Sequence, residues 1–303
     1  MELGIIGLGR MGGNMARRLR RQGFAVAAYN RDIAVTQTLA RETGIVAAES
    51  LPKLVQRLAP PRTLWLMLPA GDVTQQHIDA LVPLLSSGDI VVDGANAYYK
   101  DSMRRATQLA QRGLQFIDAG VSGGVWGLEN GYALMVGGEA QAVKRIEPVL
   151  KALAPAPNHG WMHCGPSGSG HFVKMVHNGI EYGMMQSYAE GLALLKARED
   201  FKLDLAAVTE TWRHGSVVRS WLLDLTAEFL AKDSTLKDIE PYVADSGEGR
   251  WTAIEAVEQG VPAPVMTLSL MMRVATQGKF DYAARLLAMM RKGFGGHAVK
   301  SKE

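Results

Sequence analysis

Five polar residues recur at helical spacing near the middle of the chain. They stand at positions i, i+3, i+4, i+7 and i+8, and at about 100° per residue such positions project from one stripe of a helix. The lysine and the glutamate of this stripe are a potential base and a potential acid for proton transfer. The five residues are Lys174, His177, Asn178, Glu181 and Tyr182.

The other positions of this helix are apolar, which predicts a helix that is buried almost all round. A polar stripe on such a helix needs a polar cavity, so we interpret the stripe as the lining of an active site. The alternative for any single Lys or Glu is a solvated helix face, which is common for these residue types. The apolar positions are Phe172, Val173, Met175, Val176, Ile180 and Met184.

The elements that must position this helix begin with an alternation of short apolar runs and amphipathic stretches in the first half of the chain. This pattern predicts an α/β fold with a Rossmann-like, doubly wound and mostly parallel sheet. The predicted strands are Leu3–Ile6, Ala25–Tyr29, Leu64–Leu68, Ile90–Asp93, Gln115–Asp118 and Ala133–Val136. A short apolar piece, Trp161–Cys164, is expected to end the sheet domain.

Prolines and glycines cluster between positions 155 and 170, and beyond them the periodicity is helical throughout. We therefore place a domain boundary at residue 165. The prediction is a dinucleotide-binding Rossmann domain over 1–165 and an all-α substrate and oligomerisation domain over 166–303. The predicted helices of the second domain are 169–198, 203–213, 218–231, 250–259, 264–277 and 281–292.

A glycine-rich turn follows the first predicted strand and precedes a helical stretch over Asn14–Arg21. In this context Gly7 permits the tight turn, Gly9 lets the backbone approach a pyrophosphate, and Gly12 allows close packing of helix on strand. The helix N-terminus then faces the negative charge. The context favours a nucleotide site over a purely structural glycine turn.

The end of the second predicted strand bears on the choice of cofactor. Asn30 stands at the position where NAD sites usually have a carboxylate, and Arg31 follows it, which favours a 2′-phosphate. Asp32 would repel a phosphate unless its side chain points away. The residues favour NADP and leave NAD open, and Arg31 alone is also compatible with an ordinary surface position.

Composition narrows the classes of partner. A formal charge of +3 over 303 residues, without a basic run interleaved with aromatics, argues against nucleic acid as a partner and fits a small anion.

The single cysteine, Cys164, excludes an intramolecular disulfide. The seven histidines show no zinc spacing, so we expect no metal. The chain opens into a strand without a leader, and no run could span a bilayer; we expect a cytoplasmic protein.

Four stretches together resemble one known family over nearly the whole chain: Gly7–Gly12, Ile90–Asp101, Asp118–Gly124 and Gly170–Tyr182. They are similar to the 6-phosphogluconate dehydrogenases, in their short bacterial form, within the β-hydroxyacid dehydrogenase superfamily. The last stretch is the most specific. Relatives that act on smaller hydroxyacids share its glycines and lysine, whereas the His-Asn pair followed by Glu-Tyr resembles the phosphogluconate branch.

The resemblance implies oxidative decarboxylation of 6-phosphogluconate to ribulose 5-phosphate and CO2, with reduction of NADP or NAD, in the pentose phosphate pathway. It implies that Lys174 is the general base and Glu181 the general acid. A lysine can accept the C3 hydroxyl proton only if it is substantially neutral, as burial would favour. Once protonated, it can polarise the C3 carbonyl during decarboxylation, after which Glu181 can protonate C1.

The resemblance also implies binding roles. Asn96 would contact substrate and cofactor, and a loop of three residues, Ser122, Gly123 and Gly124, would hold the substrate carboxylate with backbone N–H donors. His177 and Asn178 would bind the sugar hydroxyls, and Tyr182 and Arg273 are candidates for the phosphate. A plain strand-end turn, a glycine turn, a structural histidine and a surface arginine are the respective alternatives. The cofactor-binding set we predict is Gly7, Leu8, Gly9, Met11, Gly12, Asn30, Arg31, Asp32, Leu68 and Asn96.

The C-terminal segment resembles the closing segment of the family, in which an arginine and a histidine enter the site of a neighbouring subunit. This implies that Arg291 and His297 bind substrate and that the protein is a homodimer or homotetramer. Without the resemblance, the same residues would be an ordinary frayed terminus.

The chain departs from the family in two ways. It lacks the extra helical half of the long form, so subunit packing can differ. The stretch Asp245–Thr252 omits a segment that carries a phosphate-binding lysine, so another cation, Arg250 or Arg273, must compensate.

Two other functions remain open. A dehydrogenase of a smaller β-hydroxyacid would use the same lysine but would need neither Glu181 nor a phosphate site. A non-catalytic NADP-binding sensor would keep the glycine turn but would not need Lys174.

Overall fold

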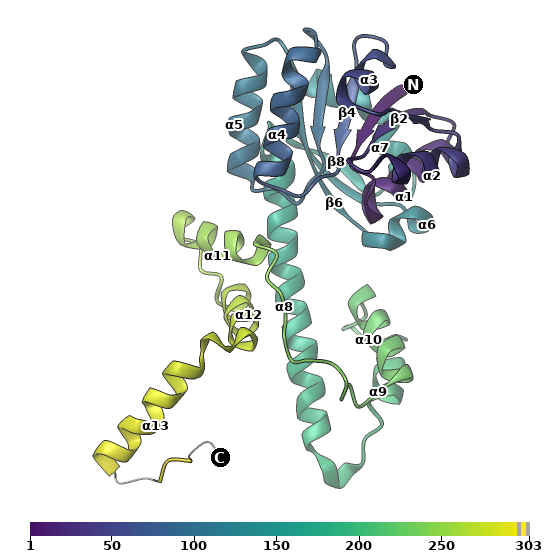
Figure 1. Ribbon diagram of the computed structural model, residues 1–303. Coiled ribbons are helices and arrows are strands. Elements are labelled where there is room, and N and C mark those ends of the chain that lie inside the picture. Colours follow the sequence, from purple (N-terminus) through teal and green to yellow (C-terminus); the bar gives the residue numbers. More distant parts are fainter. Residues whose placement is uncertain (296–297, 301–303) are drawn as a thin grey trace. The chain divides into compact units, whose positions relative to one another are not determined.

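An eight-stranded sheet forms the centre of the first half of the chain in the computed structural model, which describes residues 1–295 and 298–300 apart from the side chains at 279, 294 and 295 (Figure 1). The strand order is β3-β2-β1-β4-β5-β6-β7-β8, and every ladder is parallel except that between β6 and β7. The strands are β1 Glu2–Ile6, β2 Ala25–Tyr29, β3 Val46–Ala47, β4 Thr63–Leu66, β5 Ile90–Asp93, β6 Gln115–Ser122, β7 Ala133–Gly138 and β8 Trp161–Gly165.

The predicted doubly wound, mostly parallel sheet is confirmed. Several strand bounds differ from the expectation by one or two residues; β4 ends at Leu66 and not at Leu68, and β7 continues to Gly138. Two differences are larger. β3 was not predicted, because two residues carry no recognisable periodicity. β6 continues past Asp118 to Ser122, where its antiparallel ladder with β7 holds small residues in an extended conformation that their own propensity does not favour.

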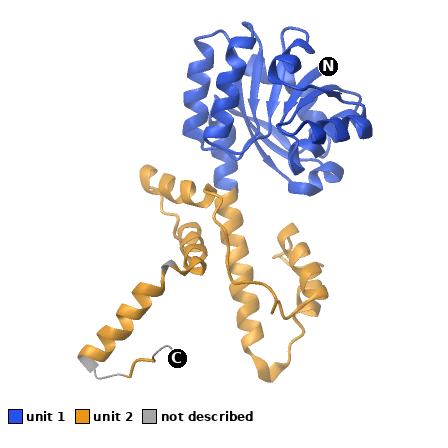
Figure 2. Cartoon of the chain, viewed as in Figure 1, with its two compact units in different colours: residues 1–177 blue, residues 178–303 orange. Residues whose placement is uncertain are grey.

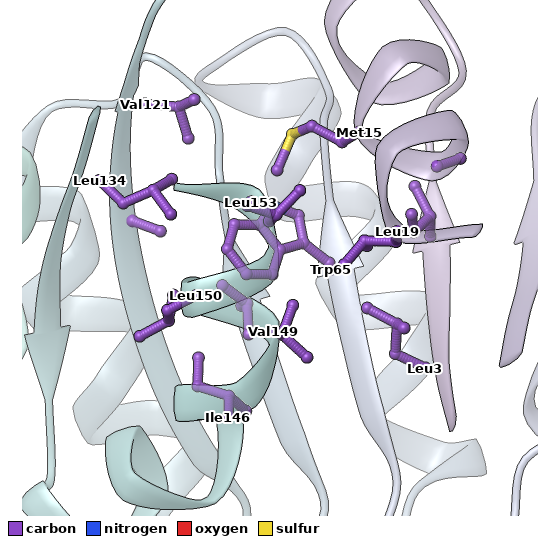
Figure 3. Packing of buried hydrophobic residues seen from close by; sticks show 14 of the residues in the cluster. Leu3, Met15, Leu19, Trp65, Val121, Leu134, Ile146, Val149, Leu150 and Leu153 are labelled. Atoms are coloured by element: carbon purple, nitrogen blue, oxygen red, sulfur yellow. The ribbon is translucent and has the colours of Figure 1, made fainter. Parts of the chain in front are cut away.

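Helices cover both faces of this sheet. One apolar cluster joins the sheet to α1 and α7, and a second joins it to α3, α4 and α5. Figure 3 shows Trp65 of β4 among Met15 and Leu19 of α1 and Leu153 of α7. The helical segments of this half are α1 Arg10–Arg21, α2 Ile33–Thr43, α3 Leu51–Gln56, α4 Asp72–Leu81, the 3-10 turn η1 Val82–Leu84, α5 Tyr99–Ala110, the 3-10 turn η2 Gly124–Trp126, α6 Gly127–Asn130 and α7 Ala140–Leu153.

The second half of the described chain is helical, as predicted. The chain divides into two compact units, Met1–His177 and Asn178–Glu303 (Figure 2), and the long helix α8 begins in the first unit and continues into the second. The elements are α8 Ser169–Ala197, η3 Glu199–Phe201, α9 Leu205–Trp212, α10 Trp221–Lys232, α11 Glu248–Gln259, α12 Pro264–Val274, the π turn η4 Ala275–Lys279 and α13 Asp281–Gly295.

The expectation that α8 is buried almost all round is wrong for this single chain. Ile180 is 53% exposed, and Val173 and Met184 are exposed as well. Ile180 and Met184 belong to the second unit, whose described elements leave both side chains exposed. Among its described residues, one small buried cluster consists of Tyr182, Ala253 and Leu270.

No helix in the described part of the chain is both long enough and apolar enough to cross a membrane.

Candidate active site

The glycine-rich turn between β1 and α1 has the geometry of a nucleotide-binding turn. Gly7 has a φ of +91°, and a Cβ there would collide with the carbonyl oxygen of Met67. A Cβ at Gly12 would collide with the carbonyl oxygen of Gly7, so α1 packs directly on the turn. Gly9 is exposed, precedes α1, and has no atom within 4 Å of its own Cβ position. The turn therefore leaves open space above an unblocked helix N-terminus.

Two hydrophobic residues of the predicted cofactor set border this turn. Leu8 is buried, and Leu68, which follows β4, places a methyl carbon 2.9 Å from the Cβ position of Gly7. Met11 is partly buried and packs against the apolar cluster of α1 and α7.

The side chains at the end of β2 are engaged with the backbone. Asn30 Oδ1 accepts the N–H of Leu8 at 3.0 Å, so Asn30 holds the glycine-rich turn. Asp32 Oδ1 accepts the N–H of Ala34 at 2.9 Å and caps α2. Arg31 between them is exposed. The Asp32 carboxylate is thus neutralised in part by a helix N-terminus, while Arg31 remains accessible.

A buried ion pair supports the loop that carries Asn96. Asp93 at the end of β5 accepts a hydrogen bond from Arg105 of α5 at 2.8 Å, and both side chains are buried. The second Asp93 oxygen accepts the N–H of Ala95 at 3.1 Å. Arg105 also donates to the Gly71 carbonyl at 3.1 Å. The loop is fixed from below, and Asn96 at its tip is exposed.

The loop after β6 contains the predicted carboxylate-binding residues. Gly123 and Gly124 have φ values of +128° and +52°, which a side chain rarely adopts, and Ser122 ends the strand. Asn14 of α1 donates to the Val125 carbonyl at 3.1 Å and ties this loop to the glycine-rich turn. Beneath the loop, burial raises the pKa of Tyr132 to about 12. Tyr132 therefore stays protonated as a packing residue.

Lys174 lies on the part of α8 that belongs to the first unit. Its side chain is only 5% exposed, which keeps the potential base away from bulk water. His177 is partly buried on the same helix. One turn before Lys174, His171 is buried and its Nδ1 lies 2.7 Å from Ser102 Oγ of α5.

The remaining stripe residues lie in the second unit. Asn178 and Tyr182 are buried, and Glu181 is partly buried. The Tyr182 hydroxyl lies 3.0 Å from Ser246 Oγ, and the Arg273 guanidinium carbon lies 3.6 Å from the centre of the Tyr182 ring. The structure therefore brings together the two residues that were predicted to bind phosphate.

Arg250 has a different environment from Arg273. It donates to Asp245 Oδ2 at 2.7 and 3.1 Å. Burial acts to raise the pKa of Asp245, but hydrogen bonds from Arg250 and from the Gly247 N–H, with the charges of Arg250 and Arg273, hold it below its ordinary value. The Arg250 charge is balanced within a salt bridge.

The C-terminal residues of the prediction are divided. Arg291 is exposed on α13, whereas His297 lies outside the described residues. In the described part of the chain, no three His, Cys, Asp or Glu side chains are placed to hold a metal ion.

Ser102, Arg105 and His171 were not among the predicted site residues. Arg105 and Ser102 lie on α5, and nothing in their spacing distinguishes them from surface residues. His171 stands three residues before Lys174 on the same stripe, and this spacing was the one signal that could have included it.

Two family models match the chain. The NAD binding domain of 6-phosphogluconate dehydrogenase matches residues 2–165, and the 6-phosphogluconate dehydrogenase C-terminal domain matches residues 170–301.

Individual relatives agree with these models. The chain is 43% identical to the NAD(+)-dependent, decarboxylating 6-phosphogluconate dehydrogenase of Haloferax volcanii, with both proteins covered fully. It is 38% identical to the NADP(+)-dependent, decarboxylating enzyme of Bacillus subtilis, over 90% of this chain and 60% of that protein. Among solved structures, it matches Plasmodium falciparum 6-phosphogluconate dehydrogenase with a TM-score of 0.85 and 29% identity, over 100% of this chain and 67% of that chain.

These matches span both halves of the chain and include relatives of the same length as well as longer ones. They agree with a nucleotide-binding first half and a helical second half. The chain belongs to the 6-phosphogluconate dehydrogenase family of oxidoreductases, whose members use NAD or NADP.

Proposed function

We propose that this protein oxidises and decarboxylates 6-phosphogluconate to ribulose 5-phosphate and CO2 while reducing NADP or NAD. The observation that carries the proposal is the stripe on α8, where a buried Lys174 and a partly buried Glu181 share one helix face. A plain dehydrogenation would require the base alone. The second proton-transferring residue favours a decarboxylating reaction, in which a carbanion-like carbon must be protonated.

In this reaction Lys174 takes the proton of the C3 hydroxyl. NADP or NAD held at the glycine-rich turn would supply the acceptor for the hydride of C3. The protonated lysine then donates a hydrogen bond to the new C3 carbonyl and stabilises the negative charge that develops there as CO2 leaves. Glu181 delivers a proton to C1 of the resulting enediol. Burial of Lys174 supports its part, because it keeps the amine away from bulk water.

The other stripe and loop residues orient the substrate. We assign the carboxylate to the N–H groups of Ser122, Gly123 and Gly124, because the positive φ values of the two glycines suit converging donors. His177 and Asn178 bind the sugar hydroxyls. Asn96, which follows β5 on a loop fixed by a buried ion pair, contacts substrate and cofactor in this proposal.

For the substrate phosphate we propose Tyr182 with Arg273, and not Arg250. A guanidinium has five N–H donors, and the structure commits one of those of Arg273 to the Ala244 carbonyl at 3.0 Å. Arg250 is instead paired with Asp245 on two of its nitrogens. Arg273 thus replaces the lysine that this chain lacks.

The cofactor site comprises the glycine-rich turn with Asn30, Arg31 and Leu68, and we favour NADP over NAD. Arg31 is exposed and forms no salt bridge with another residue that the structure describes, and Asp32 is occupied as the cap of α2. Arg31→Ala should lower kcat/KM with NADP by on the order of tenfold and leave kcat/KM with NAD nearly unchanged. A larger kcat/KM with NAD in the unmodified protein would assign NAD instead.

We further propose that the protein is a homo-oligomer, a dimer or a tetramer, which acts in the cytoplasm. The second unit exposes many large apolar side chains, among them Ile180, Leu268 and Leu287. Exposed apolar surface of this extent is typical of a protein–protein interface. The domain boundary is proposed at residue 165, between the two stretches that the family models match.

The C-terminal segment with Arg291 and His297 is proposed to complete the site of a neighbouring subunit. Deletion of residues 291–303 tests this. KM for 6-phosphogluconate should rise while NADP binding is unchanged; unaltered kinetics at low substrate would exclude the segment from the site.

The decisive experiment is an assay of purified protein with 6-phosphogluconate and either NADP or NAD, following reduced nicotinamide and released CO2 together. Equal amounts of both products would establish the proposed reaction. Reduction without CO2, obtained with smaller β-hydroxyacids, would assign the protein to the simple dehydrogenases. Cofactor binding without turnover of any such substrate would indicate a non-catalytic NADP-binding sensor.

A further inference from the structure

The first turn of α8 lies in direct backbone contact with the sheet below Lys174. A Cβ at Gly120 of β6 would collide with Lys174 Cβ and would stand 2.9 Å from Lys174 Cγ and 3.0 Å from the Gly170 carbonyl oxygen. Gly120 has no positive φ, so its own conformation does not demand glycine. Glycine is needed at this position because the Lys174 stem approaches the strand so closely.

Two more glycines allow α8 to pack directly against the backbone of the sheet. A Cβ at Gly170 of α8 would stand 2.5 Å from the Met135 carbonyl oxygen and 2.6 Å from that of Asp118. A Cβ at Gly137 of β7 would stand 2.8 Å from the Gly170 nitrogen. These neighbours are backbone atoms, which cannot rotate away as the end of a side chain can.

Asp118 fixes the start of the helix from the same strand. Its side chain is fully buried, Oδ1 accepts the N–H of Gly168 at 2.6 Å, and Oδ2 accepts the N–H of His171 at 2.8 Å. A helix leaves its first N–H groups without helical partners, and a carboxylate there is also favoured by the helix dipole. Asp118 therefore caps α8 from two residues before Gly120.

A third attachment comes from α5. The contact of 2.7 Å between Ser102 Oγ and His171 Nδ1 is buried, and it holds the residue whose N–H Asp118 accepts. The first turn of α8 is thus attached to β6 through its backbone and to α5 through a side chain. Lys174 follows within one turn.

We propose that Asp118 and Gly120 are positioning residues for the base Lys174, and this inference rests on the proposed function. Asp118 sets the position of α8 along β6, and Gly120 sets how closely the lysine stem approaches the strand. Neither acts on the substrate: the capping oxygens of Asp118 are occupied by backbone N–H groups, and Gly120 has no side chain. Their effect is on the placement of the lysine amine.

The test compares Gly120→Ala with Gly4→Ala in the full-length protein. Gly4 also lies in a buried strand, but a Cβ there would meet the flexible ends of Leu64 and Leu58, at 2.7 and 2.9 Å. Both variants should lose some stability. Misplacement of a catalytic group by about 1 Å can cost on the order of 100-fold in rate, so kcat of Gly120→Ala should fall by about that factor. KM for 6-phosphogluconate and Kd for NADP should stay within about threefold of the control variant.

The outcomes separate the two proposals. If unmodified protein and Gly4→Ala reduce NADP with 6-phosphogluconate and Gly120→Ala matches them in kcat, the positioning inference is wrong and the function stands. If the unmodified protein has no such activity, the proposed function and the positioning inference are both wrong.

If Gly120→Ala does not fold, as judged by NADP binding, Asp118→Asn and Asp118→Ala decide. The amide of asparagine keeps one acceptor oxygen, so kcat should decrease in the order unmodified, Asp118→Asn, Asp118→Ala, at unchanged KM. Equal kcat per NADP-binding site in all three proteins would overturn the inference.

Discussion

The two units of this chain differ in how completely they are packed. The first unit encloses two large apolar clusters, one on each face of its sheet, and satisfies buried charges such as Asp93 and Asp118 with several hydrogen bonds. The second unit has a single small cluster among its described residues and leaves large side chains of α8, α11, α12 and α13 exposed. The first unit can therefore hold its site by its own contacts. For the second unit, we propose that a second copy of the chain covers these exposed side chains.

The largest effect is expected where the first unit holds the base. Lys174→Met should lower kcat by about 1,000-fold, because general base catalysis contributes roughly 100- to 10,000-fold, while NADP binding should persist. The measurement is steady-state turnover with cofactor binding by fluorescence titration. Lys196→Met is the matched control, since Lys196 is an exposed lysine on the same helix. Near-normal turnover of Lys174→Met would disprove its role.

The next prediction concerns ion pairs in the two units. Arg105→Leu leaves Asp93 charged and buried, and breaking a buried pair in this way costs about 3–5 kcal/mol. In the second unit, Arg198→Ala removes an exposed pair with Asp200 and should cost less than about 1 kcal/mol. Urea unfolding at pH 7 measures both. Equal costs would mean that the difference in packing between the units is not a difference in stability.

A charged substitution on an exposed apolar position of the second unit tests whether this surface is an interface between two copies of the chain. Leu268 is 60% exposed on α12, and Leu268→Glu would be nearly neutral on a solvated surface. At an interface, the buried charge should weaken association by on the order of 10- to 100-fold. Sedimentation velocity over a dilution series measures the change. Val73→Glu, at an exposed position of α4 in the first unit, should leave association unaltered.

The smallest effect is expected on stability, when the Asp245 carboxylate is protonated at low pH. Hydrogen bonds and charges hold the folded pKa of Asp245 below its ordinary value, so its carboxylate adds stability above the unfolded pKa of about 3.9. That contribution is lost as pH falls through the folded value. Asp245→Asn should therefore lower the melting temperature by a few degrees at pH 7 and by less near pH 3. An equal loss at both values would show that the charge of Asp245 does not contribute.

Much of the fold could be predicted because its signals are local. Alternating apolar runs and helical periodicity identified the strands β1, β2 and β4 to β7, together with the helices of the second half. β8 was expected only as a short apolar piece that ends the sheet domain. The length of β6 could not be predicted, because Ala119 and Gly120 have no strand preference of their own and are held by pairing with β7.

The site was predictable to the extent that its residues share a helix or a turn. The stripe on α8 and the glycine-rich turn are read from spacing within one element. Ser102 and Arg105 are separated in sequence from the groups that they hold, and no periodicity links them to His171 or Asp93. The prediction that α8 is buried almost all round was wrong for a related reason. Apolar composition indicates that a helix face is covered, but it does not indicate which surface covers it.

The amino-acid sequence by itself determined the class of fold, the nucleotide-binding turn and the family, because each depends on residue types at fixed local spacing. Only the tertiary structure decided that Asn30 holds the turn, that Arg273 and not Arg250 stacks on Tyr182, and that the stem of Lys174 rests on Gly120. These are distances between segments far apart in the chain. They are set when many weak contacts are satisfied together in one packing arrangement, and no local pattern contains them.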